Sequence, residues 1–243
     1  MCRILGIINY KQSSEKSAEC LINSLTDQLA HGGPDDRGVY IDDESRVALG
    51  HRRLSIIDLS SSGRQPMPSD DNKIRIIFNG EIYNFPELKE ELIRLGHNFK
   101  TNTDTEVILK AYIQWGSESF KKFIGMFAFC IYDKKEKKTF LVRDQSGIKP
   151  LYYSFKNNEL IFSSETKTFI KFNNNWRENK DWKTYFLAYG FIPEPYTYLE
   201  DVFMLAKGSY LVFDSISMKF NINQFDTMSF SNTESDLDEI TFN

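Results

Sequence analysis

The second residue of the chain, Cys2, would become the N-terminal residue if Met1 were removed. Its thiol and its α-amine would then share one Cα. An N-terminal amine has a pKa near ~8 and a cysteine thiol near ~8.5, so proton transfer between them costs little at neutral pH. Such a residue supplies a nucleophile and its base without a histidine. The alternative is a cysteine that only packs as a small hydrophobic residue.

The other cysteines and the histidines lack the spacing of a metal site or a disulfide framework. The sequence holds three cysteines and three histidines, none in a CxxC pattern. Metal chemistry is therefore not expected. Cys20 falls in an expected helix and Cys130 in an expected buried strand, and we expect both to be inert. We expect His31, His51 and His97 to be structural, because an N-terminal amine makes a histidine base unnecessary.

The composition is that of an ordinary globular protein. The 243 residues are 41% hydrophobic and 14% aromatic, enough for a sizeable core. The net charge is -4, and basic residues are interspersed with acidic ones, so nucleic acid is not an expected partner. No apolar run reaches the roughly 20 residues that span a membrane, and the start does not resemble a signal peptide. We expect a cytoplasmic protein with no membrane partner.

Short apolar runs predict strands that are joined mainly by hairpins. Residues 3–9 form such a run, which would place Cys2 at the end of a strand. A strand over 74–78 is expected to end at Asn79-Gly80, a dipeptide typical of turns. The other expected strands are 39–41, 47–49 and 54–57, and the expected hairpins are 127–132 with 139–142 and 152–155 with 160–163.

Apolar residues at helical spacing predict helices over 15–30, 86–95 and 103–115. The last begins with Thr103 and Glu106 at the spacing of a capping box. Strands linked by hairpins, with helices between them, favour an α+β fold in which helices pack outside antiparallel sheets.

The C-terminal part of the sequence is more polar. Residues 187–195 and 209–213 keep strand or helix character. We expect one domain over residues 1–215 and a polar tail over 216–243, of which Ser229–Asn243 has the composition of a mobile segment.

Several polar segments accompany Cys2. They are His31-Gly32-Gly33-Pro34-Asp35, Gly50-His51-Arg52-Arg53-Leu54-Ser55-Ile56-Ile57-Asp58, Phe78-Asn79-Gly80-Glu81-Ile82-Tyr83-Asn84, Thr103-Asp104-Thr105-Glu106, Gly125-Met126-Phe127-Ala128-Phe129, the run from Arg143 to Tyr153 and Phe162-Ser163-Ser164-Glu165-Thr166-Lys167. In this order they resemble the glutaminase domain of class II glutamine amidotransferases, most closely that of glutamine-using asparagine synthetases. The likeness covers Met1 to about Phe213. It implies an N-terminal-nucleophile hydrolase fold, a four-layer αββα sandwich of two antiparallel sheets.

The resemblance also implies a reaction. Cys2 would attack the side-chain amide of glutamine, form a thioester and release ammonia, and water would then free glutamate. The attack builds an oxyanion, which needs donors worth roughly 3–4 kcal/mol each. Asn79 offers a side-chain NH₂, and Gly80 offers a backbone N–H that a ligand can approach closely. The family likeness assigns both to the oxyanion hole and to substrate contact; the alternative is a plain turn.

Glutamine also has an α-carboxylate and an α-ammonium group. Arg53 supplies a planar fork for the carboxylate, while Glu81 and Asp104 can accept hydrogen bonds from the ammonium. The resemblance adds Leu54 and Ile56 to the substrate-binding set. The alternatives are an exposed ion-pairing arginine and an aspartate that complements a helix dipole.

The sequence departs from the family pattern at several positions. Arg3 stands where a small residue is common, and Gly32 stands where the loop usually reads His-Arg-Gly-Pro-Asp. If that loop packs over the nucleophile, loss of the arginine could loosen the pocket or slow turnover. Gln145 and Ser146 replace Arg and Phe, a change expected to alter surface packing only.

A synthetase domain with a Ser-Gly-Gly-x-Asp-Ser loop normally follows in this family, and no such loop occurs here. We therefore expect ATP and Mg²⁺ on a separate synthetase chain and no cofactor on this one. The leading hypothesis is a glutaminase that delivers ammonia to that synthetase, for asparagine synthesis by default. The alternatives are a glutamine-binding regulatory subunit that has lost turnover and an inactive remnant of a truncated gene.

Overall fold

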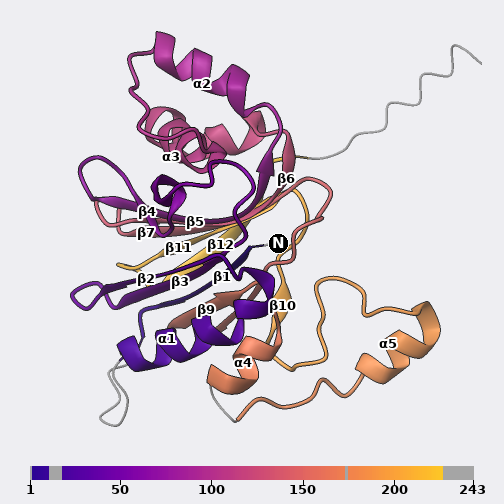
Figure 1. Cartoon of the computed structure of the whole chain (residues 1–243). Coiled ribbons are helices and arrows are strands. Elements are labelled where there is room, and N and C mark those ends of the chain that lie inside the picture. The colour runs from indigo at the N-terminus through magenta and orange to yellow at the C-terminus, as the bar shows by residue number, and fades with distance from the viewer. Residues whose placement is uncertain (1, 11–17, 173–174, 227–243) are drawn as a thin grey trace, which may run out of the picture.

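The computed structural model describes residues 2–10, 18–172 and 175–226 of the chain. Two six-stranded antiparallel sheets lie face to face, and helices cover both outer faces (Figure 1). This confirms the expected αββα sandwich. Met1 and the Ser229–Asn243 stretch lie outside the described residues, as does the start of the helix expected from residue 15.

The first sheet contains the strand that follows Cys2. That strand, β1 (Arg3–Ile8), lies between two neighbours and pairs with both in antiparallel register. Across the sheet the order is β10 (Phe203–Met204), β8 (Tyr152–Lys156), β9 (Glu159–Ser163), β1, β3 (Val47–Arg53) and β2 (Asp36–Asp42). Because β1 is a central strand, its backbone is held from both sides, and the start of the strand is a firm platform for Cys2.

The second sheet carries Asn79 and Gly80. Its order is β12 (Lys219–Gln224), β11 (Ser209–Asp214), β7 (Lys138–Arg143), β6 (Gly125–Asp133), β5 (Ile74–Ile82) and β4 (Met67–Pro68). Both faces of this sheet are covered, so its central strands are apolar almost throughout. In β6, for example, Phe129 packs on the helical side and Cys130 packs toward the other sheet.

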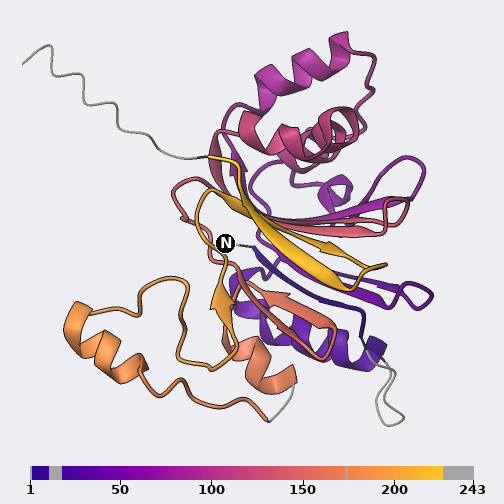
Figure 2. The ribbon, with the colours of Figure 1, turned by 180° about the vertical axis from the view of Figure 1, so that it is seen from behind.

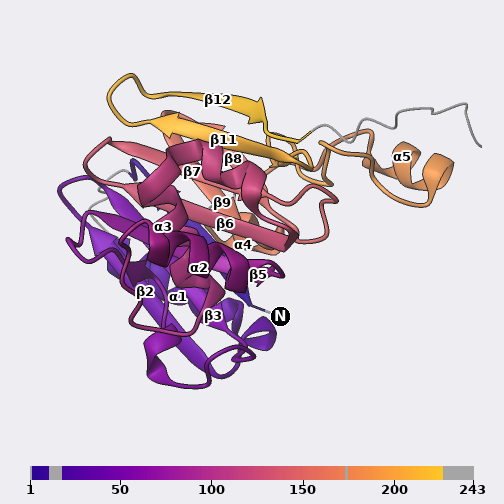
Figure 3. The same cartoon turned by 90° about the horizontal axis from the view of Figure 1, so that it is seen from above.

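Helices close the two outer layers. α1 (Ala18–Gln28) and α4 (Lys167–Phe172) cover the first sheet, and α2 (Phe85–Arg94) and α3 (Asp104–Trp115) cover the second (Figures 1 and 3). α5 (Trp182–Tyr189) stands away from both sheets (Figures 1 and 2). Short 3₁₀ turns occur at Ala30–Gly32, Ser61–Gly63 and Gly116–Lys122.

Two strand predictions near the site are wrong. β5 does not end in a turn at Asn79-Gly80 but continues to Ile82, because each of its residues pairs with β6 through the Ile82–Gly125 pair. Residues 54–57 form a loop rather than a strand. β3 stops at Arg53 because its neighbour β1 begins at Arg3, which pairs with Arg52 and leaves no further partner on that side.

The C-terminal boundary also differs from the expected one. A division at residue 215 would cut the hairpin of β11 and β12, since β12 pairs with β11 along its whole length. Phe225, just after β12, is buried against the second sheet's helical side. The polar residues of β12 alternate with Phe220 and Ile222, a pattern that a compositional reading does not detect. Residues 187–195 form the end of α5 and the following loop.

Candidate active site

Cys2 lies immediately before β1, where its side chain is partly buried. The backbone N–H of Leu54 donates to the sulfur at 3.3 Å, and the thiol lies 3.6 Å from the Leu54 carbonyl oxygen. Burial raises the pKa of the Cys2 thiol, although the Leu54 hydrogen bond and the Arg53 charge act to lower it. The protonated thiol is therefore favoured until a base removes its proton.

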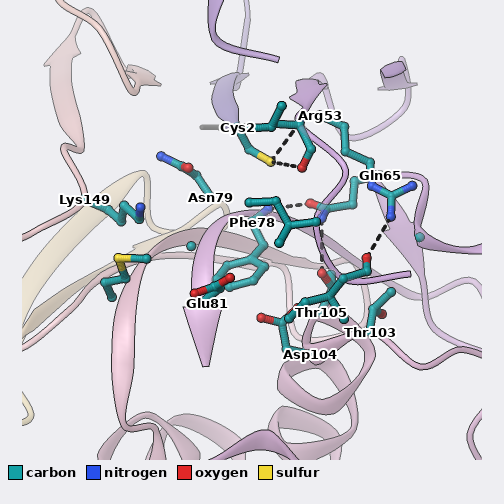
Figure 4. A pocket seen from close by; sticks show the side chains of 16 residues that line it. Cys2, Arg53, Gln65, Phe78, Asn79, Glu81, Thr103, Asp104, Thr105 and Lys149 are labelled. Atoms are coloured by element: carbon teal, nitrogen blue, oxygen red, sulfur yellow. Dashed lines mark hydrogen bonds between the residues drawn. The ribbon is translucent and has the colours of Figure 1, made fainter. Parts of the chain in front are cut away.

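Cys2 opens onto a pocket whose wall includes residues of β3 and β5 (Figure 4). The pocket also contains every residue assigned to the site from the sequence. These are Arg53, Leu54, Ile56, Asn79, Gly80, Glu81 and Asp104. Residues from both sheets, the loop after β3 and the start of α3 thus meet at one place, although Cys2 and Asp104 lie far apart in the chain.

Asn79 and Gly80 contribute one wall of this pocket from β5. The Asn79 side chain is fully buried, and neither its oxygen nor its nitrogen has a hydrogen-bond partner. A buried amide without partners is costly, so its presence at a pocket wall points to a ligand. A Cβ on Gly80 would lie 2.2 Å from the Met126 carbonyl oxygen, which explains glycine in the middle of a strand.

Arg53 reaches the pocket but is not an exposed ion-pairing side chain. Only 6% of the residue is exposed. Its guanidinium donates to the carbonyl oxygens of Ser60 at 2.9 Å, Ile57 at 3.2 Å and Asp58. It also fits against Gly63, where a Cβ would lie 2.2 Å from Nη2. The loop after β3 is therefore wrapped around this side chain, and the three bonds use both Nη atoms of the guanidinium.

The two acidic residues of the pocket have different environments. Glu81 is half-buried on β5, while Asp104 is buried at the first position of α3. Burial raises the pKa of Asp104 to about 6, although its carboxylate accepts a hydrogen bond from the Ile82 N–H at 3.1 Å. The Glu81 charge acts in the same direction as burial. Asp104 can thus change its charge near neutral pH.

The capping prediction for α3 is confirmed in part. The Thr103 side chain accepts a hydrogen bond from the Glu106 N–H at 3.2 Å. The Glu106 carboxylate, however, accepts from the backbone N–H groups of Lys100 and Thr101 rather than from Thr103. This arrangement fixes the first turn of α3, which carries Asp104 into the pocket.

Several pocket residues are not among those assigned from the sequence. Gln65 joins β5 to α3, because its Oε1 accepts from the Phe78 N–H at 2.6 Å and its Nε2 donates to Thr105 at 3.2 Å. Gln65 belongs to none of the motifs named above, and nothing in the sequence around it indicates a place in the pocket. Lys149 lines the pocket with 4% of its surface exposed, and burial lowers its pKa against the opposing effects of Glu81 and Asp144. The run from Arg143 to Tyr153 contains Lys149, so its position was a usable signal.

The remaining cysteines and histidines lie outside the lining of this pocket. Cys20 is exposed on α1, and burial raises the pKa of the Cys130 thiol far above its usual value. His51 is buried, and its Nε2 lies 3.0 Å from the Phe78 carbonyl oxygen. Burial lowers the pKa of His51 to about 4, so it is neutral at pH 7 and can donate to that oxygen. The His51 contact agrees with a structural role and the burial of Cys130 with an inert thiol, whereas Cys20 is accessible to solvent.

Within the described ranges, no cluster of three or more His, Cys, Asp or Glu side chains is arranged to hold a metal ion. In the same part of the chain, no helix has the length and apolar character needed to cross a membrane.

Comparison with known families decides the identity of the fold. The family model described as a glutamine amidotransferase domain matches residues 1–225. The chain belongs to this family. The match extends through β12, in agreement with the pairing of that strand in the second sheet.

Relatives of this glutamine amidotransferase domain include asparagine synthetases. It is 42% identical over 233 residues to "Putative asparagine synthetase [glutamine-hydrolyzing] 2" of Methanocaldococcus jannaschii. That alignment covers 88% of this chain and 44% of the relative. It is also 40% identical over 198 residues to "Asparagine synthetase [glutamine-hydrolyzing] 1" of Bacillus subtilis. That alignment covers 81% of this chain and 31% of the relative. The chain therefore spans less than half the length of these two relatives.

Solved structures support the fold of the amidotransferase domain. The glutamine phosphoribosylpyrophosphate amidotransferase of B. subtilis aligns with a TM-score of 0.66 at 20% identity, covering 94% of this chain and 50% of that one. A structure described as the allosteric regulatory enzyme of purine biosynthesis aligns with a TM-score of 0.67 at 19% identity, with the same coverage. At this identity the likeness concerns the fold alone.

Proposed function

We propose that this domain hydrolyses glutamine to glutamate and ammonia through Cys2, and that an ATP-dependent synthetase uses the ammonia. The observation that carries the proposal is that the Cys2 thiol and the buried Asn79 amide, which has no hydrogen-bond partner, line the same pocket. A nucleophile beside a donor that lacks an internal partner suits acyl transfer. Asparagine is the default product, because relatives bear the name of asparagine synthetase.

The first half of the reaction forms a thioester. After Met1 removal, the Cys2 α-amine takes the thiol proton, and the sulfur attacks the Cδ carbon of the glutamine side chain. The carbonyl oxygen becomes an oxyanion that accepts hydrogen bonds from the Asn79 NH₂ and the Gly80 N–H. The C–N bond then breaks, and the leaving nitrogen takes a proton from the α-ammonium group as ammonia departs.

The second half returns the enzyme to its starting state. Water attacks the thioester carbon while the α-amine accepts one of its protons. The same two donors stabilise the second oxyanion, the C–S bond breaks, and glutamate leaves. The sulfur recovers a proton from the α-ammonium group, so no oxidant, metal ion or other cofactor on this chain is consumed.

Substrate binding is assigned to the polar groups around the nucleophile. The part of the Arg53 fork that is free of backbone carbonyls would bind the glutamine α-carboxylate. Glu81 and Asp104 would accept hydrogen bonds from the α-ammonium group. Leu54 and Ile56 would cover the substrate from the loop after β3, where Ile56 is 64% exposed.

The synthetase would supply ATP, Mg²⁺ and the ammonia acceptor. The apolar side chains Phe186, Leu187 and Tyr189 are exposed on α5, a helix with no buried residue. Exposed apolar patches of this kind are typical of interaction surfaces, so we assign this face to the synthetase. Leu187→Asp should leave glutamine hydrolysis unchanged and remove synthetase binding. The proposed location is the cytoplasm, where the cysteine thiols would remain reduced.

The test is glutamate release from glutamine by the purified chain, with intact mass measured to establish whether Met1 is removed. Wild-type protein should release glutamate, and Cys2→Ala should lower the rate to that of the buffer. Equal, negligible rates with retained glutamine binding would instead favour a regulatory subunit. Equal rates with neither binding nor a cooperative thermal transition would favour an inactive remnant.

A further inference from the structure

The side chain of Arg3 fills a space that any side chain at position 32 would need. Gly32 is buried in the turn after α1. A Cβ built on it would lie 2.6 Å from Arg3 Cγ and 2.8 Å from both Nε and Cζ of Arg3. These separations are too short for non-bonded atoms. The Gly32 backbone has no positive φ, so the contact with Arg3 is the obstacle to a larger residue.

The guanidinium of Arg3 connects the nucleophile to the segment after β9. Its Nη1 donates to the Cys2 carbonyl oxygen at 3.1 Å, and its Nε donates to Glu165 at 2.5 Å. The preceding residue, Ser164, pairs with Ile4 through both its backbone N–H and its hydroxyl, at 2.9 and 3.0 Å. The Ser164–Ile4 backbone pair is thus followed by a side-chain link, in which Arg3 joins Glu165 to the backbone of Cys2.

Glu165 is a firm anchor for this connection. His31, next to Gly32, lies 2.7 Å from its carboxylate, and Lys167 lies 2.9 Å from it. Burial would raise the pKa of Glu165, but the bonds from Arg3, Lys167 and His31 lower it to about 2. The carboxylate is therefore ionised at every pH at which the domain would work.

We infer that Arg3 is a positioning residue for Cys2, that it holds the Cys2 backbone against Glu165, and that Gly32 is required to leave it room. The inference rests on the proposed function, since positioning matters only if Cys2 reacts. Arg3 and Gly32, two of the positions where the sequence departs from the family pattern, are consequently one structural feature. A guanidinium enters the space beside the nucleophile from position 3, where a side chain from position 32 would otherwise lie.

A double-mutant cycle tests the shared space. Arg3→Ala should lower kcat for glutamine hydrolysis by about 10- to 100-fold with KM changed by less than about threefold, because a small displacement of the nucleophile is costly. Gly32→Ala should lower kcat by about tenfold beside Arg3, and by less than about twofold in the Arg3→Ala background. Additive effects, or an Arg3→Ala kcat within about twofold of wild type, would overturn the inference.

The double variant Arg3→Ala/Gly32→Arg returns a guanidinium to the space and should recover most of the lost kcat. A kcat no higher than that of Arg3→Ala would count against the inference.

Alkylation by iodoacetamide gives a readout that does not depend on glutaminase activity. Cys20 is exposed and serves as the reference, while Cys130 is buried and reports global unfolding. In Arg3→Ala, the Cys2 thiol should leave Leu54 and react at least about threefold faster relative to Cys20, with Cys130 unlabelled. A purely structural role would expose Cys130 or leave the ratio unchanged, and either result would overturn the inference.

Arg37→Ala is the matched control, because Arg37 also pairs with a carboxylate, Asp27, but lies outside the pocket. Its kcat and alkylation ratio should equal those of wild type, and intact mass should show the same N-terminus in all variants. If wild-type protein released no glutamate, the proposed function would fail, while the alkylation cycle would still test the contact between Arg3 and Gly32.

Discussion

The backbone N–H of Leu54 donates a hydrogen bond to the sulfur of Cys2 at 3.3 Å. The residue just after β3 thereby fixes the thiol at the pocket wall, and the adjacent Arg53 guanidinium holds the loop that continues from it. The proposed nucleophile and the loop that would cover the substrate are thus held by two neighbouring residues, Leu54 and Arg53. Changes in this loop are expected to act on both thiol and substrate.

Asn79→Ala should lower kcat by about 10²–10³-fold, because it removes one oxyanion donor. The same change should reduce the free energy of unfolding by no more than about 1 kcal/mol, since the buried amide has no partner to lose. Steady-state glutamate release and urea unfolding measure the two effects. Asn221→Ala, at an exposed position of β12, is the control and should change neither quantity.

Arg53→Lys should raise the KM for glutamine by at least about tenfold, because a single ammonium cannot reproduce the planar fork. It should also free the loop at 57–60 from its carbonyl contacts and speed its cleavage by protease. Kinetics and limited proteolysis are the measurements. Arg64→Lys, at an exposed arginine paired with Asp36, should leave both unchanged. An unaltered KM would contradict the role of Arg53 in binding the carboxylate.

Asp104 predicts a pH dependence of stability. Its pKa is about 6 in the folded state, against a reference of 3.8, so the folded protein holds this proton more tightly than the unfolded chain. The stability that the proton contributes is present below about pH 4 and is lost as the pH rises to about 6. The change in the free energy of unfolding caused by Asp104→Asn should therefore be more favourable to the folded state at about pH 7.5 than at about pH 4. Unfolding curves at both pH values test this; an equal effect at both would show that the pKa is not raised.

The same residue predicts a pH dependence of substrate binding. Only ionised Asp104 attracts the glutamine α-ammonium group, so KM should rise as the pH falls through about 6. Asp104→Asn should have a high KM that changes little over this range. A wild-type KM that stays constant between about pH 5 and 7 would contradict the assignment.

Thr103→Ala should lower the free energy of unfolding by about 1 kcal/mol, because Thr103 caps α3 through the Glu106 N–H. Since Thr103 also lines the pocket beside Asp104, the KM for glutamine should rise as well. Thr103→Ser keeps the hydroxyl and should restore both values. If the serine variant behaved like the alanine variant, the methyl group rather than the cap would be responsible. Thermal unfolding and glutamate release are the measurements.

The sequence by itself predicted the local elements and the candidate residues of the site. Apolar periodicity predicted β1, the two hairpins and the helices that cover the second sheet, and Thr103 marked the start of α3. The motif residues Cys2, Asn79 and Asp104 were assigned together and do line one pocket. These features depend on side chains close together in the chain or on residue types with specific reactivity.

Only the tertiary structure decided the rest. Pairing with β6 made Asn79 part of a strand although its dipeptide favours a turn, and residues 54–57 became a loop because β1 starts at Arg3 and offers them no partner. Gln65 reaches Thr105 across 40 positions, and the Arg3 side chain occupies the space beside Gly32. Such contacts form between groups that are remote in the chain, and their energies depend on exclusion of water and on steric fit. Local periodicity carries no information about water exclusion or steric fit, so the sequence named the candidate site residues and the packed sheets decided how those residues are held.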